Sequence, residues 1–185
     1  MRAAAVGVLL LTVLGLQLFG TAMLAYAGAL AGAGAYLVAR GGCPRSGAVP
    51  WSRERALFLL RVSTGATFLW CGVYYKLLQP NLVLAIVADG GVPTFGLGPE
   101  AFVFGMALVE VSAGALMMAG VLVAPMALAL FGPFIFLGAA LGENPLGHAL
   151  FYGNLVVLAA GGAGSWRRAA SRAPFDRLAL SAPSG

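Results

Sequence analysis

The sequence predicts an all-α integral membrane protein, and three observations carry this prediction. Of the 185 residues, 61% are hydrophobic and only 9% are charged, whereas a soluble domain is about 45–50% apolar and about 25% charged. Apolar runs recur at about the 20 residues that a helix needs to cross a bilayer. The arginines behind the net charge of +5 gather in the polar joints between these runs. These features exclude a soluble enzyme, a disordered chain and a disulfide-stapled secreted module, and they indicate lipid head groups rather than nucleic acid as partners.

The first apolar run predicts a helical hairpin. Residues 3–39 contain no charge, and as one helix these 37 residues would extend about 55 Å, well beyond a hydrocarbon core of about 30 Å. Gly20 can end one helix and Thr21 can cap the next, so we expect spans at 3–19 and 22–39. The alternatives are one long tilted helix, which gives five spans in total instead of six, and a signal peptide cleaved after Ala27.

A polar linker at residues 40–55, rich in glycine, proline and arginine, marks the one domain boundary that the sequence predicts. It separates an N-terminal hairpin and basic linker (1–50) from a four-helix membrane domain (51–166), which a polar cytoplasmic tail (167–185) follows. The spans of this domain are expected at 56–78, 100–122, 124–141 and 147–163. The arginine distribution over six spans predicts a multi-pass protein of the cell inner (plasma) membrane with both termini cytoplasmic.

The segment between the first two spans of this domain is too long for a turn. Residues 82–87 are apolar, so we expect a short helix on the outer face, followed by a glycine- and proline-rich stretch that suits a lid over an entrance between spans. Glycines at helical spacing predict close helix packing, with backbone contact as their ordinary role. These are the pairs Gly28 with Gly32 and Gly65 with Gly72.

Two ionisable residues lie inside predicted spans. Arg61 is about two turns inside the third span and Glu110 is near the middle of the fourth. Each would cost about 2.5–3.5 kcal/mol at a helix centre without a partner. Because the two spans are antiparallel neighbours, we expect Arg61 and Glu110 to meet, directly or through a water or a third group. Such a pair is either a structural ion pair that fixes helix register or a pair that handles protons or a quinone.

A second polar group gathers at the outer ends of the same spans, where aromatic anchors and lysines are common. His148 is the only histidine in the chain, and an imidazole, which titrates near neutral pH, suits proton exchange with a quinol. One histidine does not make a haem site, and the isolated Cys43 and Cys71 predict neither a disulfide nor a metal site. The members of this polar group are Tyr74, Tyr75, Lys76, Asp89, Glu100, Glu143, Asn144, His148 and Tyr152.

The order of residues in the third and fourth spans resembles the DoxX family of integral membrane proteins over residues 56–165. The third span carries Leu60-Arg61, Gly65, Phe68-Leu69-Trp70, Gly72, Lys76-Leu77 and Pro80, and the fourth carries Glu110, Gly114 and Gly120. The connector Asp89-Gly90-Gly91-Val92-Pro93 resembles the family's Gly-x-Pro connector. Three residues separate Gly72 from Lys76 where the family pattern has two, and residues 1–50 lie outside the resemblance.

The resemblance implies a four-helix membrane core that works with redox partners. We therefore expect a small integral membrane subunit of a respiratory or redox complex, quinone-facing, with no redox cofactor of its own and with lipids and other membrane subunits as partners. Arg61 and Glu110 would organise the interior. The residues expected to face the quinone or a partner are Lys76, His148, Tyr75 and Glu143.

Two other function classes remain open at this stage. The first is a non-catalytic scaffold or assembly factor that packs against a larger membrane protein through the glycine-rich hairpin. The second is a transporter, which the sequence favours less because no internal repeat is evident. Whether the chain catalyses any reaction stays open.

Overall fold

The computed structural model describes residues 24–40, 53–143 and 148–170, together with the isolated positions 7, 8, 10, 13, 14 and 17. Within these residues the chain forms helices and short joints, and no strand. The main elements are α2 (Leu24–Arg40), α3 (Arg53–Trp70), a π-helix η3 (Cys71–Leu78), α4 (Asn81–Asp89), α5 (Pro99–Ala119), α6 (Val123–Ala140) and α7 (Ala149–Ala170).

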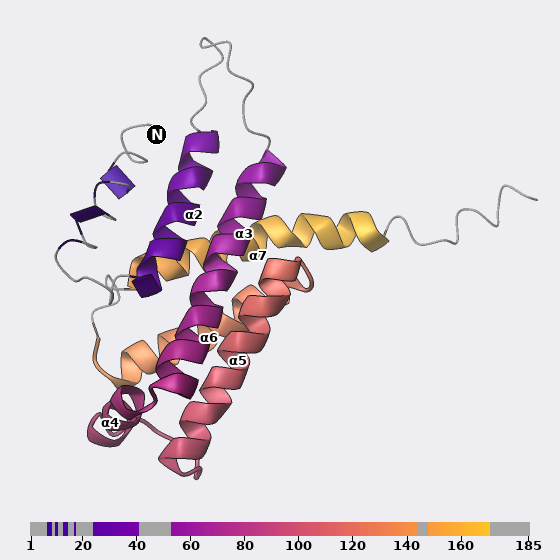
Figure 1. Ribbon diagram of the computed structural model, residues 1–185. Coiled ribbons are helices and arrows are strands. Elements are labelled where there is room, and N and C mark those ends of the chain that lie inside the picture. Colours follow the sequence, from indigo (N-terminus) through magenta and orange to yellow (C-terminus); the bar gives the residue numbers. More distant parts are fainter. Residues whose placement is uncertain are drawn as a thin grey trace, which may run out of the picture.

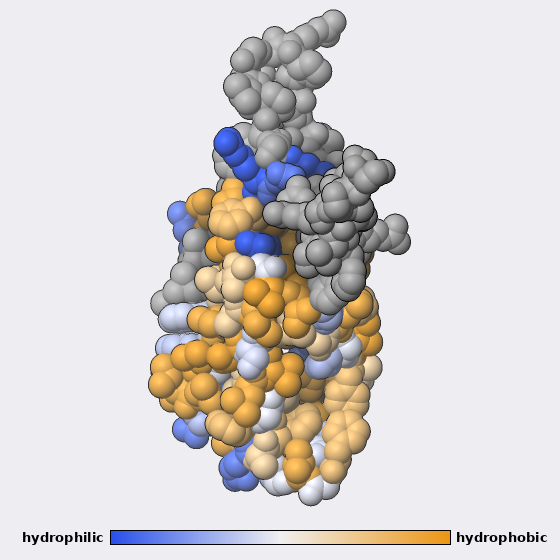
Figure 2. Space-filling model, turned by 90° about the vertical axis from the view of Figure 1, so that its right-hand side faces the viewer, coloured by the Kyte–Doolittle hydropathy of each residue, from blue (hydrophilic) through white to orange (hydrophobic). Residues whose placement is uncertain are grey.

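Three helices are long and apolar enough to cross a membrane. They are Arg53–Leu78, in which η3 continues α3, and then α5 and α6. The space-filling view shows an apolar band between hydrophilic ends, as expected for a chain with lipid around its middle (Figure 2). The prediction of a helical membrane protein is confirmed at this level.

The six-span arrangement is not confirmed. The apolar parts of α2 and α7 are shorter than a full span, at Gly28–Leu37 and Ala149–Gly161. The predicted span at 3–19 lies outside the described residues except for six isolated positions, and the turn at Gly20 and Thr21 lies outside them entirely.

The helices form two layers (Figure 1). In front, α2, α3 and α5 lie side by side with α3 in the middle, and consecutive helices of this layer run in opposite directions. Behind them α6 and α7 pack against each other and cross the first layer. The short α4 lies beside η3 and the start of α5, so the predicted short helix at residues 82–87 is confirmed.

Glycines bring the front helices close together, as the sequence predicts. A Cβ atom added at Gly28 would lie 3.0 Å from the Ser63 carbonyl oxygen of α3. Gly65 of α3 and Gly114 of α5 face each other, and a Cβ on either would come within 2.7 Å of the other's carbonyl oxygen. No side chain larger than hydrogen fits here without moving a helix. Gly32 also packs closely, against the Ser63 side chain, and a Cβ added there would lie 3.0 Å from the Ser63 Cβ.

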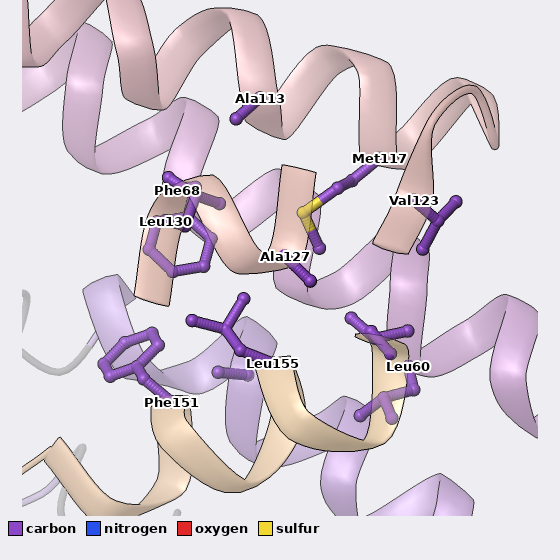
Figure 3. Close-up of a cluster of buried hydrophobic side chains, with 11 residues drawn as sticks. Leu60, Phe68, Ala113, Met117, Val123, Ala127, Leu130, Phe151 and Leu155 are labelled. Atoms are coloured by element: carbon purple, nitrogen blue, oxygen red, sulfur yellow. The ribbon is translucent and has the colours of Figure 1, made fainter. Parts of the chain in front are cut away.

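The core lies where the two layers meet. Phe68 of α3 packs edge-on against Phe134 of α6, with ring centroids 5.3 Å apart, and contacts Phe151 of α7 at 5.6 Å. Figure 3 shows this cluster between helices of both layers. Its buried members include Leu60, Phe68, Ala113, Met117, Ala127, Leu130, Phe151 and Leu155.

Two helix ends differ from the predicted spans. α5 ends at Ala119, three residues before the predicted end, because Gly120 adopts the left-handed conformation (φ +80°) and its N–H bonds back to the last turn. α7 continues to Ala170, well past the predicted end at 163. The first residues of the predicted polar tail (167–185) are therefore helical, and Figure 1 shows α7 projecting beyond the other helices.

Candidate functional site

A buried ion pair joins the first two spans of the membrane domain. Lys76 Nζ, on η3, donates a hydrogen bond to Glu110 Oε2, on α5, at 2.7 Å. The two side chains are only 10% and 9% exposed. Each charge compensates the other where lipid or protein would otherwise surround it, which is the arrangement that an intramembrane charge needs.

Close helix packing places this pair. Gly72 of η3 lies against α5, and a Cβ added to it would lie 3.2 Å from both the Ala107 carbonyl oxygen and Glu110 Cβ. Lys76 follows Gly72 within the π-helix, so its stem starts beside α5 and its ammonium group reaches Glu110. At the end of the π-helix, the Gln79 N–H donates to the Tyr74 carbonyl oxygen, five residues earlier, at 2.9 Å. π-helical segments are rare and often occur at functional sites.

The predicted contact between Arg61 and Glu110 is wrong. The Arg61 guanidinium lies against Gly120, just past the C-terminus of α5, and Glu110 is about 15 Å away along the same helix. Arg61 also stacks over the Phe58 ring, with 5.2 Å between Cζ and the ring centroid. Its Nε atom is buried and has no hydrogen-bond partner within the described ranges of the chain. The negative end of the α5 dipole favours a cation beside Gly120, where Arg61 lies. Lys76, which was expected at the outer surface, instead occupies the interior.

A cavity of about 500 Å³ opens between α5 and α6 beside Glu110. Its wall is almost entirely apolar and it is partly open to the surroundings. Of the residues that the structure describes, Glu110 is the only charged one that lines it. Such a cavity, apolar with one placed polar group, is the usual form of a small-molecule site. Its lining, which defines the α5/α6 cavity below, is Phe95, Leu97, Phe102, Gly105, Met106, Val109, Glu110, Leu130, Pro133, Phe134, Phe136 and Leu137.

The loop between α4 and α5 covers one side of the α5/α6 cavity. Phe95 is 76% exposed, yet its ring lies 5.5 Å from that of Phe136 on α6. Its φ of +55° is unusual for a residue with a side chain. Val92, at the start of the loop, is buried against α4 and α5. The glycine- and proline-rich loop predicted as a lid thus lies against the cavity, which Phe95 and Leu97 line.

A second polar group lies between α6 and α7. Glu143 Oε2 is 3.4 Å from His148 Nδ1, and the Tyr152 ring centroid is 6.3 Å from that of His148. These three side chains line a second pocket, the His148 pocket, of about 370 Å³. The Phe134 ring contacts His148, with ring centroids 5.8 Å apart, and Phe134 also lines the α5/α6 cavity.

The other predicted site residues are dispersed. Tyr74 stacks on Trp70 with centroids 4.9 Å apart, and the Tyr75 ring meets Tyr74 edge-on. Asp89 and Glu100 are exposed near the ends of α4 and α5. Asn144 and Cys43 lie outside the described residues. Among the described residues, no group of three or more histidine, cysteine or acidic side chains could hold a metal ion.

Asn154 is an interior polar residue that the sequence analysis missed. It lies on α7, is 4% exposed, and donates hydrogen bonds to the Ala29 carbonyl at 3.1 Å and to Thr64 Oγ1 at 3.3 Å. It therefore links α7 to α2 and α3. A lone amide within the apolar run of the last span was the available signal, because an uncompensated amide there is costly.

Comparison of the chain with family models, curated proteins and solved structures finds no match. The resemblance to the DoxX family stays a prediction.

Proposed function

We propose that this protein is a small helical subunit of a membrane redox complex that binds a quinone-type molecule in the α5/α6 cavity and carries no redox cofactor of its own. The observation that carries the proposal is the cavity itself. It is apolar, it has the size of a small-molecule site, and one carboxylate residue, Glu110, lines it, with its charge balanced by Lys76. The remainder of the proposal rests on the resemblance in residues 56–165.

The cavity matches the shape and chemistry of such a ligand. Small-molecule sites enclose about 300–1,000 Å³, and about 500 Å³ accommodates a substituted ring with the start of an apolar tail. Aromatic side chains from α5, α6 and the loop, among them Phe102, Phe134 and Phe136, provide faces on which a ring can stack. The cavity lies between two helices that are long and apolar enough to cross a membrane, so a lipid-soluble ligand would reach it from the bilayer.

The scaffold alternative loses part of its original support. It relied on a smooth glycine surface on the N-terminal hairpin, but Gly28 and Gly32 of α2 pack against Ser63 and Thr67 of α3. That face of α2 is therefore covered within the protein and is not offered to a partner.

Filling the cavity tests the proposal. A side chain added at Gly105, on α5, meets no atom within 4 Å and enters the cavity, so Gly105→Leu should occupy ligand space without touching the Lys76/Glu110 pair. Gly132→Leu is the matched control, because Gly132 is an exposed helical position on α6 with equally open space. In lipid nanodiscs, binding of a short-tailed benzoquinone or its hydroquinone should weaken at least tenfold in Gly105→Leu and stay unchanged in Gly132→Leu.

Absence of binding by the unsubstituted protein, or equal binding by both variants, would contradict the cavity as a quinone site. Native mass spectrometry of the protein extracted from its own membrane tests the subunit role. A redox partner that is retained together with a quinone supports that role, and a large non-redox partner would favour the scaffold.

A further inference from the structure

The polar groups around the α5/α6 cavity are acceptors. Among the lining residues in the described part of the chain, Glu110 is the only one with a charged or hydrogen-bonding side chain apart from the weakly accepting thioether of Met106. Its Oε2 atom accepts from Lys76, and no hydrogen bond joins its Oε1 atom to any residue in the described part of the chain. An ionised carboxylate accepts hydrogen bonds and donates none.

Two residues near the cavity, Lys76 and Pro133, supply no hydrogen-bond donor to a ligand in it. Lys76 carries N–H donors beside Glu110, but Lys76 does not line the cavity and its ammonium group donates to Glu110 Oε2. On α6, Pro133 lines the cavity and has no backbone N–H, so it adds no donor there.

The charge balance of the Lys76/Glu110 pair further limits which ligands the cavity can bind. Lys76 already compensates Glu110 at 2.7 Å, so a cationic ligand would add an unbalanced charge to an apolar cavity at high cost. The cavity therefore favours a neutral molecule that carries a hydrogen-bond donor.

We infer that the α5/α6 cavity binds the hydroquinone form in preference to the quinone, with a ring hydroxyl donating to Glu110 Oε1. This inference rests on the proposed function. A hydroquinone presents two hydroxyl donors, whereas the quinone presents only carbonyl acceptors, which would face the carboxylate without a hydrogen bond. A hydrogen bond to a charged group is worth enough to change a dissociation constant by about 10–100-fold.

The test is equilibrium binding under anaerobic conditions to the full chain in nanodiscs. The probes are a short-tailed benzohydroquinone, the corresponding benzoquinone, and the hydroquinone dimethyl ether, which keeps the shape but lacks the donors. The hydroquinone should bind about 10–100-fold more tightly than either of the other two.

An exchange of the acceptor adds a second test. In the double variant Lys76→Met with Glu110→Gln, both charges of the pair are removed together, and the amide offers both a donor and an acceptor. The preference for the hydroquinone should then fall to within about threefold, while Gly132→Leu should retain the full preference.

The outcomes separate the two proposals. Equal binding of the quinone and the hydroquinone, or tighter binding of the dimethyl ether, overturns the preference and leaves the proposed quinone site standing. Binding of none of the three probes overturns the proposed function and this inference together.

Discussion

At the scale of single residues, the pair of Lys76 and Glu110 is the feature on which the site depends. A buried pair contributes little to stability compared with apolar residues of the same size, but removing one partner leaves an uncompensated charge. The side chains are about one tenth exposed, so water cannot replace the lost partner. A role for the Glu110 carboxylate at the cavity, as proposed above, would give this pair a use beyond stability.

Lys76→Met should lower the free energy of unfolding by about 3–5 kcal/mol, because Glu110 is left buried without its cation. The double variant Lys76→Met with Glu110→Leu should recover most of the loss. Thermal unfolding in detergent measures both. Glu100→Gln, at an exposed position in the first turn of α5, is the control and should change little; a similarly small effect of Lys76→Met would show that the two side chains do not interact in the protein.

Asn154→Ala should destabilise the protein by about 1–3 kcal/mol, because the carbonyl of Ala29 and the hydroxyl of Thr64 lose a buried donor. The matched control is Asn81→Ala, which changes an exposed residue at the start of α4. Unfolding in detergent is again the measurement. Equal stability of the two variants would contradict the role of Asn154 in joining α7 to the front helices.

Sequence alone placed Glu110 in the interior but gave it the wrong partner. The contact of Gly65 with Gly114, and of Gly72 with Ala107, sets an antiparallel register in which Glu110 lies between the levels of Arg61 and Lys76. Regular helix geometry places Arg61 and Lys76 at similar axial distances from Glu110, so it does not determine which of them is the partner. The π-helix at Cys71–Leu78 brings Lys76 closer, because its wider turns advance less along the axis. Nothing in the residue pattern marked that segment.

At the scale of elements, glycine contacts hold the front layer together. Gly114→Ala should destabilise the protein by about 1–3 kcal/mol, because the new Cβ would lie 2.6 Å from the Gly65 carbonyl and 2.9 Å from the Leu69 nitrogen. Gly132→Ala, with no atom within 4 Å, should be neutral or slightly stabilising. The melting temperatures of the two variants test this prediction. A lower melting temperature for Gly132→Ala than for Gly114→Ala would contradict the close approach of α3 and α5.

The presence of helices could be predicted from the apolar runs. Their ends could be predicted only where particular residues, such as a capping glycine, indicate them. The short helix α4 was expected from its apolar run between polar joints. The left-handed Gly120 ends α5 earlier than hydropathy suggests, because Val121 and Leu122 are apolar but belong to the joint. α7 continues into residues that hydropathy assigns to a tail, since arginine and alanine are good helix formers.

At the scale of the whole molecule, α5 is long and apolar enough to cross a membrane, and Figure 2 shows an apolar band between hydrophilic ends, so we expect α5 to span the bilayer. Glu100 and Val121 lie at its two ends and are exposed, separated by about 31 Å along the helix. In a background with both cysteines replaced by serine, Glu100→Cys and Val121→Cys should react with an impermeant maleimide from opposite sides. Val121→Cys should react from the cytoplasmic side if the predicted orientation holds. Labelling of both from one side would contradict a membrane crossing by α5.

The central claim is that the α5/α6 cavity holds a quinone-type ligand, and photolabelling tests it most directly. An azido-substituted benzoquinone is activated in native membranes, and the labelled peptides are identified by mass spectrometry. We predict label on cavity residues of both helices, such as Met106, Val109 and Phe136, and loss of that label with excess hydroquinone. Label confined to the His148 pocket or to the outer face of α6 at Leu128, or label that excess hydroquinone does not reduce, would contradict the claim.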